Sequence, residues 1–271
     1  MKRLILCASV ASLLGITIKI ATANEPTTRP STTATTPIFN INDHVSRLYG
    51  EIDFGEGEKI SFAAFEAAYR GYINLRNSGK LDSTRSVLTV ADMSLSSTRK
   101  RLWLIDLQNR KVLMNEYVAH GQGSGGEFAT VFSNTENSHQ SSIGFYVTDD
   151  TYVGKHGTSL RLRGMDAGYN SAAYDRAIVV HGADYVSSSF IASQGRLGRS
   201  WGCPAVSRQA IGKLIDYIKG GTCLFMYYPQ KQYLAGSPWI NQKVDRIPAE
   251  FQLNDAATIA ANQLEPLAEV H

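Results

Sequence analysis

The stretch VVHGADYVSSSFIASQGRLGRSWGCPAV, from Val179 to Val206, holds one histidine and one cysteine that each stand beside a glycine. His181 follows the apolar residues AIVV, which are typical of a strand, and Cys203 lies in a Gly-Cys-Pro turn. A histidine at a strand end is well placed to accept a proton, and a cysteine among small residues is open to a substrate carbonyl. The pair therefore points to acyl transfer through a thiol nucleophile.

The residues next to this pair fit the same chemistry. Gly202 leaves room for a substrate, and the backbone N–H groups of Gly202 and Cys203 would be free to stabilise a developing oxyanion. No acidic residue stands at an obvious third position, so we expect a backbone carbonyl, such as that of Gly182, to orient the His181 ring. The alternative roles are a buried structural cysteine and a structural histidine.

Residues 1–23 have the composition of an export signal. Lys2 and Arg3 precede an apolar stretch at 4–18, and an Ala-Thr-Ala cleavage pattern predicts a mature chain that begins at Asn24. The apolar stretch is shorter than the roughly 20 residues that a membrane-spanning helix needs. We therefore expect an exported protein of the periplasm or cell envelope, with no membrane span after signal removal.

The charge of the mature chain is balanced. Removing residues 1–23 takes away three basic residues and no acidic one, which leaves 24 of each. A neutral chain without a run of Lys or Arg has no electrostatic footprint for nucleic acid, so we expect no nucleic-acid partner.

The mature chain keeps two cysteines, Cys203 and Cys223. Nothing in the sequence excludes a disulfide between them in an oxidising compartment. However, Cys223 lies in TCLFMYY, a run that is typical of a buried strand, where cysteine acts as a small hydrophobe. We therefore expect two unpaired thiols.

The composition divides the chain into five segments. After the signal, the sequence predicts a Thr/Pro-rich linker at 24–37, an N-terminal helical extension at 38–86 that packs on the catalytic domain, the catalytic domain at 87–230, and a C-terminal tail at 231–271. No secondary structure is predicted for the tail.

Periodicity and caps predict two helices and a series of strands. One helix spans 62–77 with Ser61 as its N-cap, and the other follows Ser207 and ends at Gly220 and Gly221. The aromatic stripe of the first helix (Phe62, Phe65, Tyr69 and Tyr72) favours core packing over a sugar-binding face. Strands are predicted at 87–92, 101–107, 111–120, 143–149, 158–164 and 176–182 and in TCLFMYY. The predicted fold class is mainly β with a few helices (α+β).

The histidine–glycine pair followed by a Ser-x-Gly-Cys turn resembles the murein L,D-transpeptidases, the YkuD-like cysteine transpeptidases, in the variant branch described as the murein L,D-transpeptidase catalytic domain family. The resemblance covers residues 87–228. It is carried by VAHGQGSGG, FSNTENSHQSSIGFY, YVGKHGTSLRLRGMD, RAIVVHGADYV and GRSWGCPAV. It implies a YkuD-like β-sandwich or barrel with Cys203 as nucleophile, His181 as base, and Ser200 and Gly202 in the turn around the cysteine.

In such a family, the cysteine attacks the diamino-acid carbonyl of a peptidoglycan stem tetrapeptide and expels the terminal D-alanine. The amine of another stem peptide then takes the acyl group, which gives a 3–3 cross-link, whereas water would give L,D-carboxypeptidase activity. The resemblance implies peptidoglycan stem peptides as partners and no cofactor.

The substrate-binding residues are less sharply indicated. The arginine that the family usually has two residues after the cysteine is replaced by Ala205, and Arg196 or Arg199 could take over its contact with a negative group. His156 and His120 each stand beside glycine at a predicted strand end, and the polar stretch at 133–142 could bind a peptide. Each of these residues could equally be a solvated loop residue. The candidate substrate-binding residues are Ser200, Arg199, Arg196, His156 and His120.

Two other functions remain open. A zinc peptidase would use histidines or Cys203 as ligands, but the chain lacks the short ligand spacings that zinc sites prefer, so no metal is expected. A non-catalytic peptidoglycan-binding domain would make His181 and Cys203 dispensable, although an unpaired thiol is unusual for a passive binder in an oxidising compartment.

Overall fold

The computed structural model describes residues 40–253, all of which belong to the second of two compact units, Phe39–His271. The predicted signal at 1–23, the linker at 24–37 and the end of the C-terminal tail lie outside the described residues. Between residues 40 and 253, no helix is long and apolar enough to cross a membrane.

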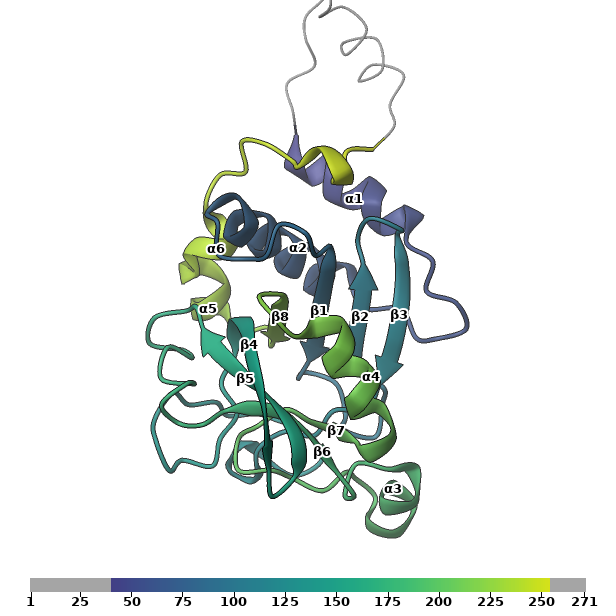
Figure 1. Cartoon of the computed structure of the whole chain (residues 1–271), viewed down its shortest axis with the longest axis vertical. Coiled ribbons are helices and arrows are strands. Elements are labelled where there is room, and N and C mark those ends of the chain that lie inside the picture. The colour runs from purple at the N-terminus through teal and green to yellow at the C-terminus, as the bar shows by residue number, and fades with distance from the viewer. Residues whose placement is uncertain (1–39, 254–271) are drawn as a thin grey trace, which may run out of the picture. The chain divides into compact units, whose positions relative to one another are not determined.

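One eight-stranded sheet is the framework of the fold (Figure 1). Its strands are β1 (Val87–Asp92), β2 (Leu102–Asp106), β3 (Lys111–Glu116), β4 (Gly144–Gly154), β5 (Gly157–Gly164), β6 (Val179–Ala183), β7 (Ala205–Ser207) and β8 (Cys223–Tyr227). They follow the order β3-β2-β1-β8-β4-β5-β6-β7, with β1–β8 and β6–β7 as the parallel pairs and antiparallel pairing elsewhere. The predicted mainly β fold with a few helices is confirmed.

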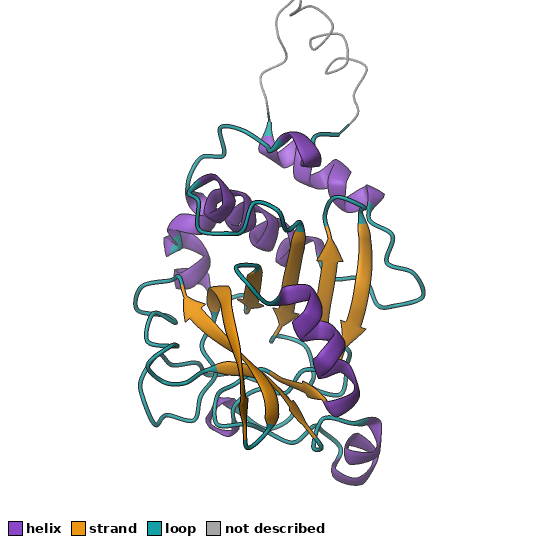
Figure 2. Ribbon diagram, viewed as in Figure 1, coloured by secondary structure: helices purple, strands orange, loops and turns teal. Residues whose placement is uncertain are grey.

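Helices pack against both faces of this sheet (Figure 2). They are α1 (Ile41–Glu51), α2 (Phe62–Asn77), α3 (Ser188–Gln194), α4 (Arg208–Ile218), α5 (Lys231–Gly236) and α6 (Pro238–Asn241), with short 3₁₀ turns η1 (Gln122–Ser124) and η2 (Ala249–Phe251). In β1, Leu88 and Val90 belong to the core that includes α2, whereas Val87 and Ala91 belong to the core that includes α4. Near-continuous apolar strands are typical of a sheet that is covered on both faces.

Helix α2 has the bounds and the cap that the sequence predicts. The Oγ of Ser61 accepts a hydrogen bond from the Ala64 N–H at 3.3 Å. The later residues of its aromatic stripe are buried, and Phe62 at the first turn is 38% exposed. The stripe therefore serves core packing and not an open sugar-binding face.

Two of the strands lack three or more of the residues that the sequence predicts for them. The strand predicted at 111–120 ends at Glu116, and Ala119 forms an isolated bridge with Ala205 instead. The strand predicted at 176–182 begins at Val179, because Ala177 has a φ of 54° and a left-handed backbone cannot continue a strand. The first difference brings Ala119 beside β7, and the second brings the Ala177 carbonyl to the sulfur of Cys203.

The chain after β8 packs back onto the unit as far as residue 253, where the sequence predicts no elements. The amide of Asn74 in α2 donates to the Trp239 carbonyl of α6 at 2.8 Å. The buried carboxylate of Asp166 accepts from the Ser237 hydroxyl at 2.8 Å. The described part of the predicted tail thus shares the core of the sheet and α2.

Candidate active site

The parallel pairing of β6 and β7 brings the two ends of the quoted stretch together. His181 lies opposite Ala205, and its N–H points to the Pro204 carbonyl at 3.4 Å. A parallel pair needs a crossover connection, and this one contains α3. By the register of the pair, Cys203 lies beside Val179 at the start of β6. His181 and Cys203, which are 22 residues apart in the sequence, are thus brought together at the edge of the sheet.

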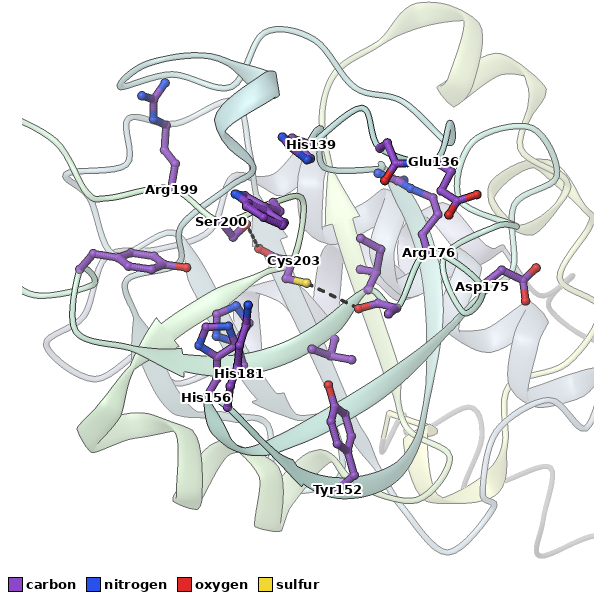
Figure 3. A pocket seen from close by; sticks show the side chains of 17 residues that line it. Glu136, His139, Tyr152, His156, Asp175, Arg176, His181, Arg199, Ser200 and Cys203 are labelled. Carbon is purple, nitrogen blue, oxygen red and sulfur yellow. Dashed lines mark hydrogen bonds between the residues drawn. The ribbon is translucent and has the colours of Figure 1, made fainter.

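Hydrogen bonds from Ser200 shape the turn that carries Cys203 (Figure 3). The Ser200 hydroxyl donates to the Cys203 carbonyl at 2.6 Å and accepts from the Gly202 N–H at 3.1 Å. Gly202 has a φ of 117°, and a Cβ there would come within 2.7 Å of the Gln140 carbonyl, so glycine is required. Contrary to the sequence-based expectation, the Gly202 N–H is not free for an oxyanion, because Ser200 engages it.

The thiol of Cys203 is half-buried and hydrogen-bonded. It donates to the Ala177 carbonyl, with a sulfur–oxygen distance of 3.8 Å. Burial raises the pKa of the Cys203 thiol, while the Val179 N–H, the charge of Arg176 and the N–H of Cys203 itself act in the opposite direction. The backbone N–H groups and the Arg176 charge that would stabilise a Cys203 thiolate are therefore already next to the thiol. Cys223 is buried in β8, and the expectation of two unpaired thiols is confirmed.

The ring of His181 is fixed as the sequence predicts. It is 3% exposed, and its Nδ1 lies 3.2 Å from the Gly182 carbonyl. Since a carbonyl oxygen only accepts, Nδ1 carries a proton, and in the neutral ring Nε2 keeps its lone pair. Burial lowers the pKa of His181, and the neighbouring His156, Arg208 and Lys155 lower it further against the Gly182 hydrogen bond. The ring is thus held in the neutral form of a base.

A cavity of about 530 Å³ opens over the sulfur and the imidazole (Figure 3). It gathers five of the residues that the sequence singles out: Cys203, His181, Ser200, Arg199 and His156. Three residues of the polar stretch at 133–142 also line it: Glu136, Asn137 and His139.

Two of the expected substrate-binding residues do not line this cavity. His120 is 1% exposed, and its Nδ1 accepts from the Arg101 guanidinium at 2.8 Å. Burial, followed by the charge of Arg101, lowers the pKa of His120 to about 4. Its carbonyl accepts from the Ser200 N–H at 3.0 Å, so His120 supports the cysteine turn from inside. Arg196 donates to the carbonyl of its neighbour Leu197 at 2.7 Å.

Arg176 is a charged residue of the site that sequence reasoning misses. Its guanidinium donates to the Ser133 carbonyl and Ser142 hydroxyl at 2.8 and 2.5 Å, and to the Ser138 hydroxyl and Gln140 carbonyl at 3.2 and 2.8 Å. It therefore fixes the polar stretch at 133–142 to the cavity wall. The signal in the sequence is slight, a lone arginine before the apolar residues AIVV.

The turn between β4 and β5 places a second imidazole against that of His181. The ring centroids of His156 and His181 are 4.5 Å apart, with 26° between the ring planes. Arg208 at the start of α4 donates to the His156 carbonyl at 2.8 Å and to the Asp184 carboxylate at 3.2 Å. This clamp holds the turn over β6.

The described residues contain no group of three or more His, Cys, Asp or Glu side chains that could hold a metal ion.

Comparison with known proteins gives one family. A family model for the L,D-transpeptidase catalytic domain matches residues 56–227. Among solved structures, an L,D-transpeptidase from Mycobacterium smegmatis is 14% identical over 53% of this chain and 59% of that one, with a TM-score of 0.33. L,D-transpeptidase 1 from Mycobacterium tuberculosis is 14% identical over 52% and 61%, with a TM-score of 0.29. An L,D-transpeptidase from Stackebrandtia nassauensis is 13% identical over 69% and 90%, with a TM-score of 0.33.

These matches are partial in length. The chain spans about three fifths of the two mycobacterial structures. No curated protein matches it.

Proposed function

This chain belongs to the L,D-transpeptidase catalytic domain family, and from that premise we propose that it is an exported peptidoglycan L,D-transpeptidase with Cys203 as nucleophile and His181 as base. It forms 3–3 cross-links between stem peptides, or acts as an L,D-carboxypeptidase when water is the acceptor. The observation that carries the proposal is the β6–β7 pairing, which places both side chains at one cavity.

The first half-reaction acylates Cys203. The free Nε2 of His181 takes the thiol proton, and the sulfur bonds to the diamino-acid carbonyl carbon of a stem tetrapeptide. The bond to the terminal D-alanine then breaks, and His181 returns the proton to the leaving amine. A thioester remains on Cys203.

The second half-reaction transfers the acyl group. The side-chain amine of another stem attacks the thioester, and His181 removes the proton that this amine loses. The carbon–sulfur bond breaks as the new amide bond forms, and the proton returns from His181 to the thiolate. With water as the nucleophile, the same steps release a tripeptide stem.

Groups described above would stabilise the negative charge that develops in these steps. The Cys203 N–H is the backbone donor beside the sulfur, and the guanidinium of Arg176 favours the thiolate. Arg199 lines the cavity and takes the part of the arginine that the family usually has after the cysteine. His156 completes the substrate-facing set, Ser200 lines the cavity while its hydroxyl holds the cysteine turn, and Arg196 and His120 lie outside the cavity.

Intact-mass measurement after incubation with a tetrapeptide stem or a carbapenem tests the proposal. We expect a covalent adduct on the wild-type protein and none on Cys203→Ala. The matched control is Cys223→Ala, which removes the other thiol of the mature chain and should still form the adduct.

The absence of an adduct on a wild-type protein with a free Cys203 thiol would refute the mechanism and favour a non-catalytic peptidoglycan-binding domain. Export is tested separately, by N-terminal sequencing of protein recovered from the cell envelope. We expect the mature chain to begin at Asn24, and a chain that still begins at Met1 would contradict export through a cleaved signal.

A further inference from the structure

Trp201 is an exposed aromatic residue at the rim of the candidate active site. It precedes Gly202 and Cys203, lines the same cavity, and is 67% exposed. The other two tryptophans are less open, since Trp103 is buried and Trp239 is half-buried against the core, with its indole N–H donating to the Met165 carbonyl at 2.8 Å. An indole left open beside a reactive residue is available for a ligand that offers an apolar surface.

The ring of Trp201 is held in place before any ligand binds. The His139 ring stacks on it, with centroids 4.7 Å apart and planes 11° apart. His139 is itself fixed, because its carbonyl accepts from the Gly123 N–H at 2.9 Å and its Nδ1 lies 3.0 Å from the amide of Gln122. A preorganised surface of this kind loses little side-chain freedom on binding.

A positive charge lies over the same ring. The Lys155 ammonium, from the turn between β4 and β5, is 5.6 Å from the Trp201 ring centroid in a cation–π contact, and it also lines the cavity. An ammonium group can donate to hydroxyl and carbonyl oxygens at the edge of a ligand that covers the indole. The site thus pairs a flat apolar surface with a hydrogen-bond donor.

We propose that Trp201, braced by His139, is a platform for a sugar ring of the glycan strand that carries the donor stem, with Lys155 donating to the oxygens of that sugar. This inference rests on the proposed function. The stem residues that precede the scissile bond offer small or charged side chains, whereas a pyranose ring has a flat face of C–H groups. Such C–H groups are attracted to the electron-rich face of an indole.

The reach of the stem agrees with this placement. Three stem residues separate the sugar from the scissile bond, and an extended chain of three residues spans roughly 10 Å. Trp201 and Cys203 are two residues apart, which limits the separation of their Cα atoms to about 7 Å. A sugar on the indole can therefore belong to the same stem whose carbonyl meets the sulfur.

Two donors that differ only in the sugar test the platform. The measurement is kcat/KM for D-alanine release from a free tetrapeptide and from the same tetrapeptide on its N-acetylated disaccharide. We expect the wild-type enzyme to prefer the disaccharide donor by about tenfold, the scale of one lost apolar contact surface. Trp201→Ala should abolish this preference and leave kcat/KM for the free tetrapeptide and acylation by a carbapenem within about twofold of wild type.

Two further variants complete the kinetic test. Trp201→Phe should retain part of the preference, and Phe128→Ala, which removes an exposed aromatic residue outside the cavity, should retain all of it. A wild-type enzyme without preference for the disaccharide donor, or an equal loss on both donors in Trp201→Ala, would overturn the proposal.

A binding measurement keeps the platform testable if the wild-type protein turns over neither donor. The peptide-free disaccharide is titrated into Cys203→Ala, and tryptophan emission is followed. We expect a saturable change that is absent from the Cys203→Ala, Trp201→Phe double variant. No saturable change in the single variant would refute the sugar platform independently of catalysis.

Discussion

The imidazole of His156 lies over that of His181, with 4.5 Å between the ring centroids. One ring comes from the turn between β4 and β5 and the other from β6, so the stack covers His181 with a residue from a different part of the sheet. We infer that His156 is a positioning residue, which keeps water from His181 and helps to hold its ring neutral.

Replacing His156 should therefore change the pH dependence of acylation. Burial lowers the pKa of His181. The acid limb of the wild-type pH–rate profile should therefore lie below the ordinary pKa of histidine, and the acylation rate should be lost as pH falls through the lowered pKa. His156→Ala uncovers the ring, which should move this limb to higher pH, whereas His156→Phe keeps the cover and should move it less. The measurement is the rate of carbapenem acylation against pH. If the acid limb of the pH–rate profile stays in place in His156→Ala, the stack does not lower the pKa of His181.

Arg176 should act on both the thiol and the polar stretch at 133–142. Without its charge, the pKa of Cys203 should rise, so the alkylation of the thiol should shift to higher pH. We expect Arg176→Ala to slow acylation on the order of tenfold, because the four hydrogen bonds to the stretch are also lost. Arg176→Lys should preserve the alkylation profile better than the acylation rate, because it keeps the charge but not the planar fork. Equal effects of Ala and Lys on both measurements would contradict these separate roles.

The turn that carries Cys203 should not tolerate a side chain at Gly202. With a φ of 117° and a carbonyl 2.7 Å from the added Cβ, Gly202→Ala should lower the free energy of unfolding by about 1–3 kcal/mol. Gly212 in α4 is the matched control, because its added Cβ meets nothing within 4 Å, and Gly212→Ala should raise stability by about 0.5–1 kcal/mol. Urea denaturation of both variants checks the contrast. Similar stabilities for the two variants would mean that the turn can adjust.

His120 should make the fold sensitive to acid. Its pKa is about 4 in the folded chain against an ordinary 6.5, so the unfolded chain binds the proton first as pH falls. Stability should decline between pH 6.5 and 4 by about 3 kcal/mol from this residue. His120→Gln keeps an acceptor for Arg101 and should flatten the decline in urea denaturation across this range. A variant as acid-sensitive as the wild type would assign the effect elsewhere.

Local patterns predict the parts of the fold that local forces determine. The caps Ser61 and Ser207 and the apolar periodicity after them place α2 and α4 correctly. His181 and Cys203 are recognisable because the glycines that form a turn beside each of them are adjacent in the sequence. The family resemblance is confirmed by the family model.

What the sequence does not reveal depends on pairing between distant strands. The order and register of the sheet, which no short window contains, bring Arg176 to the site and stack His156 on His181. His120 has the same glycine neighbour as His181, yet it points into the protein, because a histidine–glycine pair does not specify the side of the chain that is buried. The helices α3, α5 and α6 span seven residues or fewer, too few for a clear period.

The separation of the two thiols determines whether an oxidised Cys203 can form a disulfide within the chain. Cys223 lies in the core of β8, and the strands β4, β5 and β6 separate it from the turn of Cys203. Cys7, the third cysteine of the chain, belongs to the predicted signal. If the sulfur of Cys203 is oxidised to a sulfenic acid, Cys223 cannot reach it to form an internal disulfide. Recovery then requires a thiol from another molecule, which makes the chain dependent on the reducing partners of its compartment.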